Sequence, residues 1–476
     1  MAEMRFGGKV RSLRRAQRLS QAELARRLGI SASYLNLIEH NHRPLTAELL
    51  VKVAEVLPVD VKALSGKNDE RVVAELLEAF GDPLFENLDV IAGDVGELAT
   101  AHPVASEAIL RLYQAYRDTR GALENLASKV SDQGALSGAP SRFPSDEVSD
   151  LLQRHSNYFP ELEAGADALA RDASLDDRDG LFAGLATHLE DTHGVHVRID
   201  RASAMHGALR RFDPKTGVLA LSEVLRRGSR NFHLAHQVGL LTQGTVLGRI
   251  AADPLLTTDE ARALCRVALA SYFAAAILMP YEPFLSSARR ERYDVDLLGD
   301  RFRTSFEQVC HRLTTLRRPG AEGIPFHMLR VDIAGNISKH FSASGFRLAR
   351  FSGACPRWNV FEAYLTPGMI RTQISQMPDG QTFFDIARTV RNHSGGFHAP
   401  HTSYAISLGC ELVHARDIVY ADGRDLANRG AFTEVGPTCR LCNRLDCEQR
   451  AFPPVQHPLI VNEHVRGVSF YAPPES

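Results

Sequence analysis

The N-terminal part of the chain alternates short apolar runs with polar turns. Its apolar positions recur at helical spacing. The predicted helices cover residues 10–17, 22–28, 34–39, 47–57, 71–80 and 105–126. Residues 131–145 are rich in Gly, Ser and Pro, so we expect a linker there.

The pattern changes in the middle of the chain. Residues 181–192 are expected to be helical and residues 195–199 alternate as in a strand. A hairpin is expected to follow, with strands 208–212 and 218–221 around the turn 213–217. The next expected helices are 231–243 and 259–279. The second is apolar but contains Ser271 and stops at Pro280, so we expect a buried helix and no membrane span.

Beyond Pro325 the chain has short Gly-rich segments with scattered aromatic residues, which predicts a mixed β-rich domain. We therefore expect a multidomain fold, mainly α with α+β parts. The expected divisions are an all-α bundle at 1–66, a helical connector and linker at 67–147, an α+β domain at 148–325 and the β-rich domain at 326–476.

Composition agrees with this division, because 44% apolar and 24% charged residues are typical of globular proteins. The N-terminus lacks the apolar stretch of a secretory signal, so we expect a cytoplasmic protein. The net charge of −2 hides an asymmetry: up to Gly66 there are eleven Lys and Arg against six Asp and Glu. An anionic polymer is the expected partner of this segment.

Residues 19–39 predict a helix-turn-helix. Ser20 followed by Glu23 has the spacing of a capping box. Gly29 supplies a left-handed turn, and Ser31 can cap the next helix. The segment resembles the XRE family of phage-repressor-like domains. That resemblance implies a homodimer on two-fold symmetric double-stranded operator DNA.

The outward face of the second helix, with the start of the first, is expected to bind DNA. The expected base contacts or helix-capping contacts are Gln21, Ser31, Ser33, Tyr34 and Asn36. The expected phosphate contacts are Arg11, Arg14, Arg15 and Arg43.

Residues 231–241 look like a zinc-peptidase helix that has lost its chemistry. His236 stands at the first ligand position of a His-Glu-x-x-His motif, but Gln237 replaces the Glu and Leu240 the second His. The next helix resembles that of ImmA/IrrE-type metallopeptidases, with Leu269 where a ligating Glu is expected. One ligand cannot hold catalytic zinc. We predict a degenerate peptidase-like domain with no enzyme activity, and a cleft for an apolar ligand lined by Leu240, Leu269, Tyr272 and Phe273.

Three cysteines lie within nine residues near the C-terminus, in the spacing Cys439-x2-Cys442-x4-Cys447. One loop with this spacing can wrap three thiolates around one metal centre. Cys410 is the preferred fourth ligand and Cys355 the alternative. The spacing does not choose between an iron–sulfur cluster and structural zinc.

The three parts in this order resemble the short-chain fatty acyl-CoA regulators of bacteria. The resemblance covers essentially the whole chain, and its strings lie at 292–295, 305–316, 332–339, 355–360, 377–380 and 439–454. It implies a transcription regulator whose effector is a short-chain acyl-CoA, with propionyl-CoA as the first choice. It also favours a 4Fe-4S cluster over structural zinc at the cysteine cluster. Further effector contacts are expected from cations and aromatic residues close in sequence: Arg301, Arg303, Phe306, Lys339, Phe341, Arg347, Arg350 and Trp358.

Two other functions are compatible with parts of the sequence. One is a redox or metal sensor whose input is the cysteine cluster. The other is a zinc peptidase that cleaves a repressor, against which Gln237, Leu240 and Leu269 speak.

Overall fold

The chain forms two compact units in the computed structural model. Unit 1 is drawn from residues 1–141, 348–353 and 437–476, and unit 2 from 142–347 and 354–436. The structure describes residues 10–11, 13–14, 17, 19–39, 43, 46, 49, 52–53, 56–57, 67–85, 90, 92–131, 144–172, 180–346, 354–392, 398, 401–439 and 442–453.

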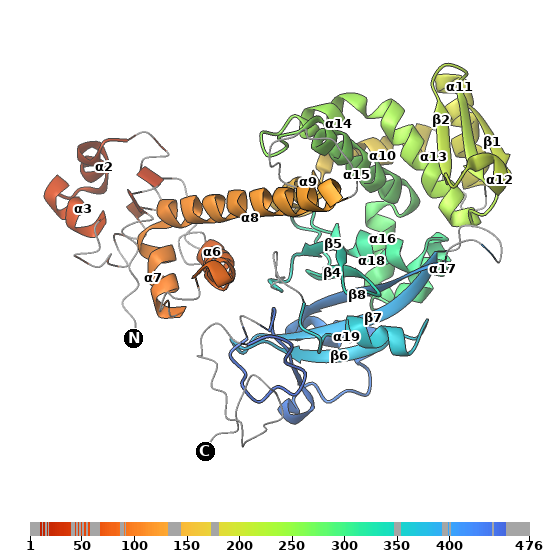
Figure 1. Cartoon of the computed structure of the whole chain (residues 1–476). Helices are drawn as coiled ribbons and strands as arrows, with labels where there is room; N and C mark the ends of the chain where they lie inside the picture. Colours follow the sequence, from red (N-terminus) through yellow and green to blue (C-terminus); the bar gives the residue numbers. More distant parts are fainter. Residues whose placement is uncertain are drawn as a thin grey trace. The chain divides into compact units, whose positions relative to one another are not determined.

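The N-terminal helices are α2 (Gln21–Leu28) and α3 (Ala32–Glu39) (Figure 1). Their apolar sides share one core with the flanking segments: Val10, Leu24, Ala25, Leu28, Leu35, Val53 and Leu57. These elements confirm the predicted all-α character of the region. Parts of the predicted helices 10–17 and 47–57 lie outside the described residues.

Three further helices of unit 1 pack on one another. They are α6 (Lys67–Phe80), α7 (Ala92–Ala101) and α8 (Pro103–Ser131), with the short η1 (Pro83–Phe85) between the first two. The buried Tyr113 on α8 donates a hydrogen bond to Asp82 Oδ2 at 2.9 Å. The predicted helices at 71–80 and 105–126 are confirmed. Most of the predicted linker, 132–143, lies outside the described residues.

Unit 2 is built around a group of helices and two sheets. Its α-helices before the large sheet are α9 (Pro144–Arg154), α10 (Pro160–Asp172), α11 (Leu181–His193), α12 (Ala202–Met205), α13 (Arg227–Thr242), α14 (Gly244–Ala251), α15 (Asp259–Leu278), α16 (Tyr281–Arg290), α17 (Val295–Phe302) and α18 (Phe306–Thr314). One apolar core runs from Val148 to Ala421 and includes residues of both the helices and the sheets.

Helix α15 is the central helix of this unit. By length and composition alone it could cross a membrane. In the fold, however, eleven of its 20 side chains are buried, and it packs against α9, α10, α13 and α14 (Figure 1). Its charged residues lie in the first two turns, at the end away from the fully buried segment 272–278. The predicted buried helix is confirmed.

A three-stranded sheet follows α11. Its strands are β1 (His196–Asp200), β2 (Arg210–Asp213) and β3 (Val218–Ser222), in the order β1-β3-β2. The hairpin of β2 and β3 confirms the prediction, and Asp213 accepts hydrogen bonds from Lys215 N and the Thr216 hydroxyl in its turn. The parallel pairing of β1 with β3 was not predicted.

The second sheet has six strands. They are β4 (His327–Asp332), β5 (Ile337–Ser342), β6 (Arg371–Gln376), β7 (Thr382–Asn392), β8 (Thr402–Glu411) and β9 (Thr433–Glu434), in the order β5-β4-β8-β7-β6-β9. All neighbours are antiparallel except β6 and β9. The short elements beside it are α19 (Asn359–Glu362), η2 (Ala363–Leu365), η3 (Leu412–Asp417), η4 (Val419–Ala421) and η5 (Arg429–Ala431). The predicted β-rich character is confirmed.

A buried polar network ties the central strands of this sheet together. His327 Nε2 lies 2.7 Å from Asp385 Oδ1, and His327 Nδ1 lies 2.8 Å from Ser344 Oγ. The Ser375 hydroxyl donates to Asp385 Oδ2 at 2.7 Å. Position 409 must be glycine here, because a Cβ would come within 2.5 Å of the His327 ring and closer still to Asp385.

Candidate DNA-binding surface and ligand site

Helices α2 and α3 are joined as the sequence predicts. The Ser20 hydroxyl caps α2 by accepting from Glu23 N, and Gly29 ends it with φ +71°. Ser31 Oγ accepts from Tyr34 N at 3.1 Å and caps α3. The Glu23 side chain does not complete the predicted capping box, because its carboxylate pairs with Arg26 and Arg27. The two caps fix the chain direction on both sides of the turn.

The expected recognition face is largely accessible. Ser33 and Asn36 are exposed, and Tyr34 is partly exposed. Gln21 at the start of α2 donates to Asn36 Oδ1 at 3.1 Å. This bond holds two of the expected base-reading amides together at the junction of α2 and α3.

The same junction contains an ion pair that the sequence reasoning missed. Arg14 Nε and Nη2 donate to the two oxygens of Glu39 at 2.6 and 2.9 Å, and Arg14 Nη1 donates to Leu19 O. Gln21 also donates to Glu39 Oε2 at 3.1 Å. The Glu39 side chain is 1% exposed and that of Arg14 is 11% exposed. The pair holds the end of α3 against the first helical segment.

This geometry changes the expectation that Arg14 contacts a phosphate. Three of its five N–H groups are engaged inside the domain. Arg43 is exposed and Arg11 is partly exposed. Arg15 lies outside the described residues. One signal in the sequence could have indicated this buried ion pair. The acidic Glu39 directly follows the core residue Ile38 on a helix that is otherwise largely apolar.

The peptidase-like helix is α13, and its site does not fit zinc. His236 is 4% exposed. Its Nδ1 contacts Arg210 Nη1 from strand β2. A guanidinium therefore stands beside the one remaining ligand position, and no carboxylate joins it. Among the described residues, no three His, Cys, Asp or Glu side chains are placed to hold a metal ion.

No open cleft is seen at three of the four residues expected to line an apolar ligand site, and that site stays a prediction. Leu269 and Phe273 are fully buried and Tyr272 is 2% exposed, so these side chains are part of the core. The Tyr272 hydroxyl donates to Glu163 Oε1 at 2.6 Å. Glu163 is in turn paired with Arg312 at 2.6 Å. Periodicity predicted the apolar helix correctly, but it could not show that both sides of α15 are covered.

The other expected effector residues that the structure describes are engaged within the fold, and their role in effector binding stays a prediction. Arg301 pairs with Glu291 at 2.8 Å, and Lys339 pairs with Glu307 at 3.0 Å. Phe306, Phe341 and Trp358 are buried, and Arg303 ends α17 in a left-handed conformation. Phe306 packs under the guanidinium of Arg388. Arg347 and Arg350 lie outside the described residues.

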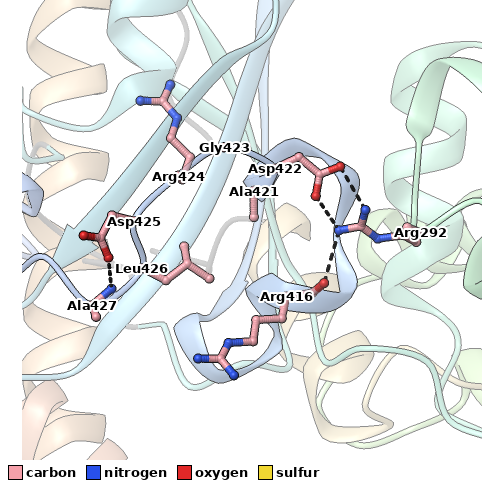
Figure 2. A pocket seen from close by; sticks show the side chains of 9 residues that line it. All are labelled: Arg292, Arg416, Ala421, Asp422, Gly423, Arg424, Asp425, Leu426 and Ala427. Carbon is pink, nitrogen blue, oxygen red and sulfur yellow. Dashed lines mark hydrogen bonds and ion pairs between the residues drawn. The ribbon is translucent and has the colours of Figure 1, made fainter.

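A surface pocket of about 330 Å³ lies between Arg292 and residues 416–427 (Figure 2). Arg292 donates to both oxygens of Asp422, at 2.9 and 2.7 Å, and to the carbonyl oxygens of Arg416 and Ile418. Figure 2 shows its guanidinium facing Asp422. The pocket is open, and its central cation is already paired. Arg292 therefore fixes the 416–422 segment in place.

The cysteine-rich loop is held together by one arginine. Arg450 donates to the carbonyl oxygens of Cys439 at 2.6 Å and Cys442 at 2.7 Å. Ala451 N–H donates to Cys439 Sγ at 3.5 Å, a contact that suits a metal-bound thiolate. Cys442 is buried, and Cys439 and Cys447 are partly exposed. The three thiols of this loop are the right kind of ligand for a metal centre. Their sulfur atoms are not close enough together in this structure to hold one.

The proposed fourth ligands lie in unit 2. Cys410 is fully buried in β8, opposite Phe384, and burial raises the pKa of its thiol. Cys355 is 7% exposed. Cys265 and Cys310 are core residues as predicted.

Three family models match successive parts of the chain. A family model described as short-chain fatty acyl coenzyme A regulator, C-terminal, matches residues 315–471. The IrrE N-terminal-like domain matches residues 190–314, and a helix-turn-helix matches residues 10–64.

Full-length relatives agree with these matches. The chain is 39% identical to the HTH-type transcriptional regulator RamB of Mycobacterium tuberculosis, with 99% of each chain covered. It is 40% identical to the propionyl-CoA carboxylase regulator of Cereibacter sphaeroides, with 98% of each covered. A solved Mycobacterium tuberculosis transcriptional regulator is 39% identical with a TM-score of 0.67, over 70% of this chain and 100% of that one.

Proposed function

The chain belongs to the short-chain fatty acyl-coenzyme A regulators, which are helix-turn-helix transcription regulators, and on that premise we propose that a short-chain acyl-CoA controls its binding to operator DNA. The observation that carries the DNA-binding half is the exposed face of α3 beside Gln21. Ser33, Tyr34, Asn36 and Gln21 read base edges in the major groove. Arg11, Arg15 and Arg43 contact phosphates.

The proposal of an acyl-CoA effector rests on the family and on the names of the relatives. One relative is named for propionyl-CoA carboxylase, so propionyl-CoA is the first effector to test. An effector can shift operator affinity only by binding the DNA-competent and incompetent states with different affinities. The protein acts in the cytoplasm as a regulator and not as a peptidase, since Gln237, Leu240 and Leu269 replace the catalytic groups.

Titration of operator binding tests this function. With propionyl-CoA present, we expect the operator dissociation constant to change by about 5- to 150-fold, the usual range of allosteric coupling. Acetyl-CoA should act more weakly and free CoA least. Fluorescence anisotropy of labelled operator DNA measures the dissociation constant. The salt concentration is held fixed, because affinity for DNA depends steeply on ionic strength. Identical dissociation constants with all three ligands would exclude effector sensing and leave DNA binding standing.

We propose that the protein is a homodimer and that α8 forms part of its interface. One face of α8 packs on α6 and α7, but the opposite face carries Ala105, Ala108, Leu112, Ala115 and Thr119, all exposed. Their spacing of three and four residues is that of a coiled-coil seam. Leu112 is 73% exposed. A second α8 would cover this seam and pair two DNA-binding heads.

Leu112→Glu is expected to weaken self-association by at least tenfold, because it puts a charge in the centre of the seam. Sedimentation equilibrium measures the monomer–dimer constant. Leu365→Glu is the matched control, since Leu365 is 81% exposed on unit 2. If Leu112→Glu leaves the constant unchanged, α8 is not the interface.

We propose that Cys439, Cys442 and Cys447 hold a 4Fe-4S cluster, with Cys410 or Cys355 as the fourth ligand and structural zinc as the alternative. The Cys439 Sγ contact with Ala451 N–H and the loop closure by Arg450 support a metal-bound loop. The cluster would either hold the loop in its fold or act as a redox input, which is the second candidate function.

Anaerobic purification separates these alternatives. A 4Fe-4S protein is expected to be brown, with broad absorption in the visible range. Cys442→Ser should abolish that absorption, because the cluster loses one of its thiolate ligands. Cys265→Ser, a change at a core cysteine, should retain it. A colourless protein with one bound zinc would exclude the cluster.

A further inference from the structure

Among the described residues, no carboxylate pairs with Arg210, a cation in the former peptidase site. It lies on β2 and is only partly exposed. Its one polar side-chain contact among the described residues is His236 Nδ1. Burial lowers the pKa of Arg210, and no carboxylate opposes that effect. A partly buried guanidinium is normally paired with an anion, because desolvating an unpaired charge is costly.

The histidines beside Arg210 are neutral. Burial and the Arg210 charge lower the pKa of His236 to about 3 and that of His233 to about 4. Because a guanidinium can only donate, the neutral His236 accepts from Arg210 at Nδ1. Among the described residues, the guanidinium is therefore the positive charge at the site, and none of them engages its remaining N–H groups.

The surrounding sequence strengthens this positive charge. Residues 196–230 contain seven Arg and one Lys against three Asp and Glu, whereas the whole chain has a net charge of −2. Of the three acidic residues, Asp213 is engaged by its own turn and Asp200 by Arg198. Glu223 accepts from Ala202 N. None of them is paired with Arg210.

We propose that Arg210 takes the place of the peptidase metal and turns this site into a metal-free binding site for an oxyanion, a phosphate or a carboxylate. The guanidinium donates two N–H groups to the anion, and His233, three residues before His236 on α13, is a further hydrogen-bonding group. The proposal rests on the proposed function, because the two sources to distinguish are a phosphate of the CoA moiety and the carboxylate of a free short-chain acid.

Isothermal titration of the full-length protein tests the site. The probes are propionyl-CoA, adenosine 3′,5′-bisphosphate and sodium propionate. Arg210→Met should weaken binding of the recognised probe by at least tenfold. Arg211→Met is the matched control, since Arg211 is next on the same strand and donates to the Met205 carbonyl oxygen. It should change affinity less than twofold.

The three probes give distinct outcomes. Binding of the bisphosphate that depends on Arg210 identifies a phosphate, and binding of propionate that depends on Arg210 identifies a carboxylate. If propionyl-CoA binds wild type and Arg210→Met equally, the anion site is excluded while effector sensing stands. If no probe binds wild type and operator affinity does not respond to acyl-CoA, the proposed function fails as well.

A second measurement needs no variant. The carbon-bound ring protons of His233 and His236 report the site in NMR spectra of wild type. The recognised probe should shift both resonances at saturation, whereas His196, which is exposed and paired with Glu190, should not respond. Unchanged His233 and His236 resonances with a saturating bound probe would overturn the proposal even if Arg210→Met fails to fold.

Discussion

Replacing Arg312 with Met is expected to destabilise unit 2 by about 3–5 kcal/mol, because it leaves a buried carboxylate without its cation. Arg312 is 0% exposed and Glu163 is 2% exposed. The guanidinium donates to both Glu163 oxygens, at 2.6 and 2.9 Å, to Met279 O and to the Thr315 hydroxyl. The residual Tyr272 bond to Glu163 cannot neutralise the charge.

The same network explains why so large an effect is expected from one side chain. It joins α10, α15 and α18, which are far apart in sequence, and all of its polar groups are satisfied inside the core. Removing one member forfeits several charge-assisted hydrogen bonds at once. The double variant Glu163→Gln/Arg312→Met removes both charges, so it should recover part of the lost stability.

Trp358 makes this test specific. It is the only tryptophan of the chain, it is buried, and it belongs to unit 2, so its fluorescence during urea unfolding follows unit 2 alone. Arg154→Met is the control, because Arg154 pairs with Asp253 at the surface and is 52% exposed; we expect a change of at most about 1 kcal/mol there. An unchanged urea midpoint in Arg312→Met would show that the pair does not stabilise the unit.

The sequence was most informative where the constraints are local. Ser20, Gly29 and Ser31 lie within twelve residues and each has one backbone role, so the caps and the turn could be predicted from spacing. The β2–β3 hairpin was predicted for the same reason, since its turn residues bond among themselves. Such features depend on backbone geometry that the nearest neighbours determine.

The sites that failed prediction depend on partners distant in sequence. Tyr272 and Arg312 meet Glu163 across separations of 109 and 149 residues, which periodicity cannot reveal. Arg210 on β2 lies 26 residues from His236 on α13, and the two side chains meet only in the folded chain. The sequence motif showed that zinc ligands are missing from α13, but it could not show that Arg210 contacts His236 there.

Arg14→Met is expected to lower operator affinity at least tenfold through the fold of the DNA-binding domain. The Glu39 carboxylate would remain buried with only the Gln21 amide beside it. Loss of one partner of a buried pair costs about 3–5 kcal/mol. A domain of about sixty residues has roughly 3–9 kcal/mol of total stability, so much of this variant would be unfolded at its N-terminus.

Hydrogen exchange and salt dependence separate this structural role from the phosphate contact first expected of Arg14. Faster amide exchange throughout α2 and α3, with unchanged Trp358 fluorescence, would show local loss of structure. The slope of log affinity against log salt should stay the same for the folded fraction, whereas loss of a phosphate contact reduces the slope by about 1. Arg27→Met is the matched control, since its pair with Glu23 is 48% and 30% exposed. If Arg14→Met keeps normal exchange but reduces the slope, Arg14 binds phosphate and the ion pair with Glu39 does not organise the domain.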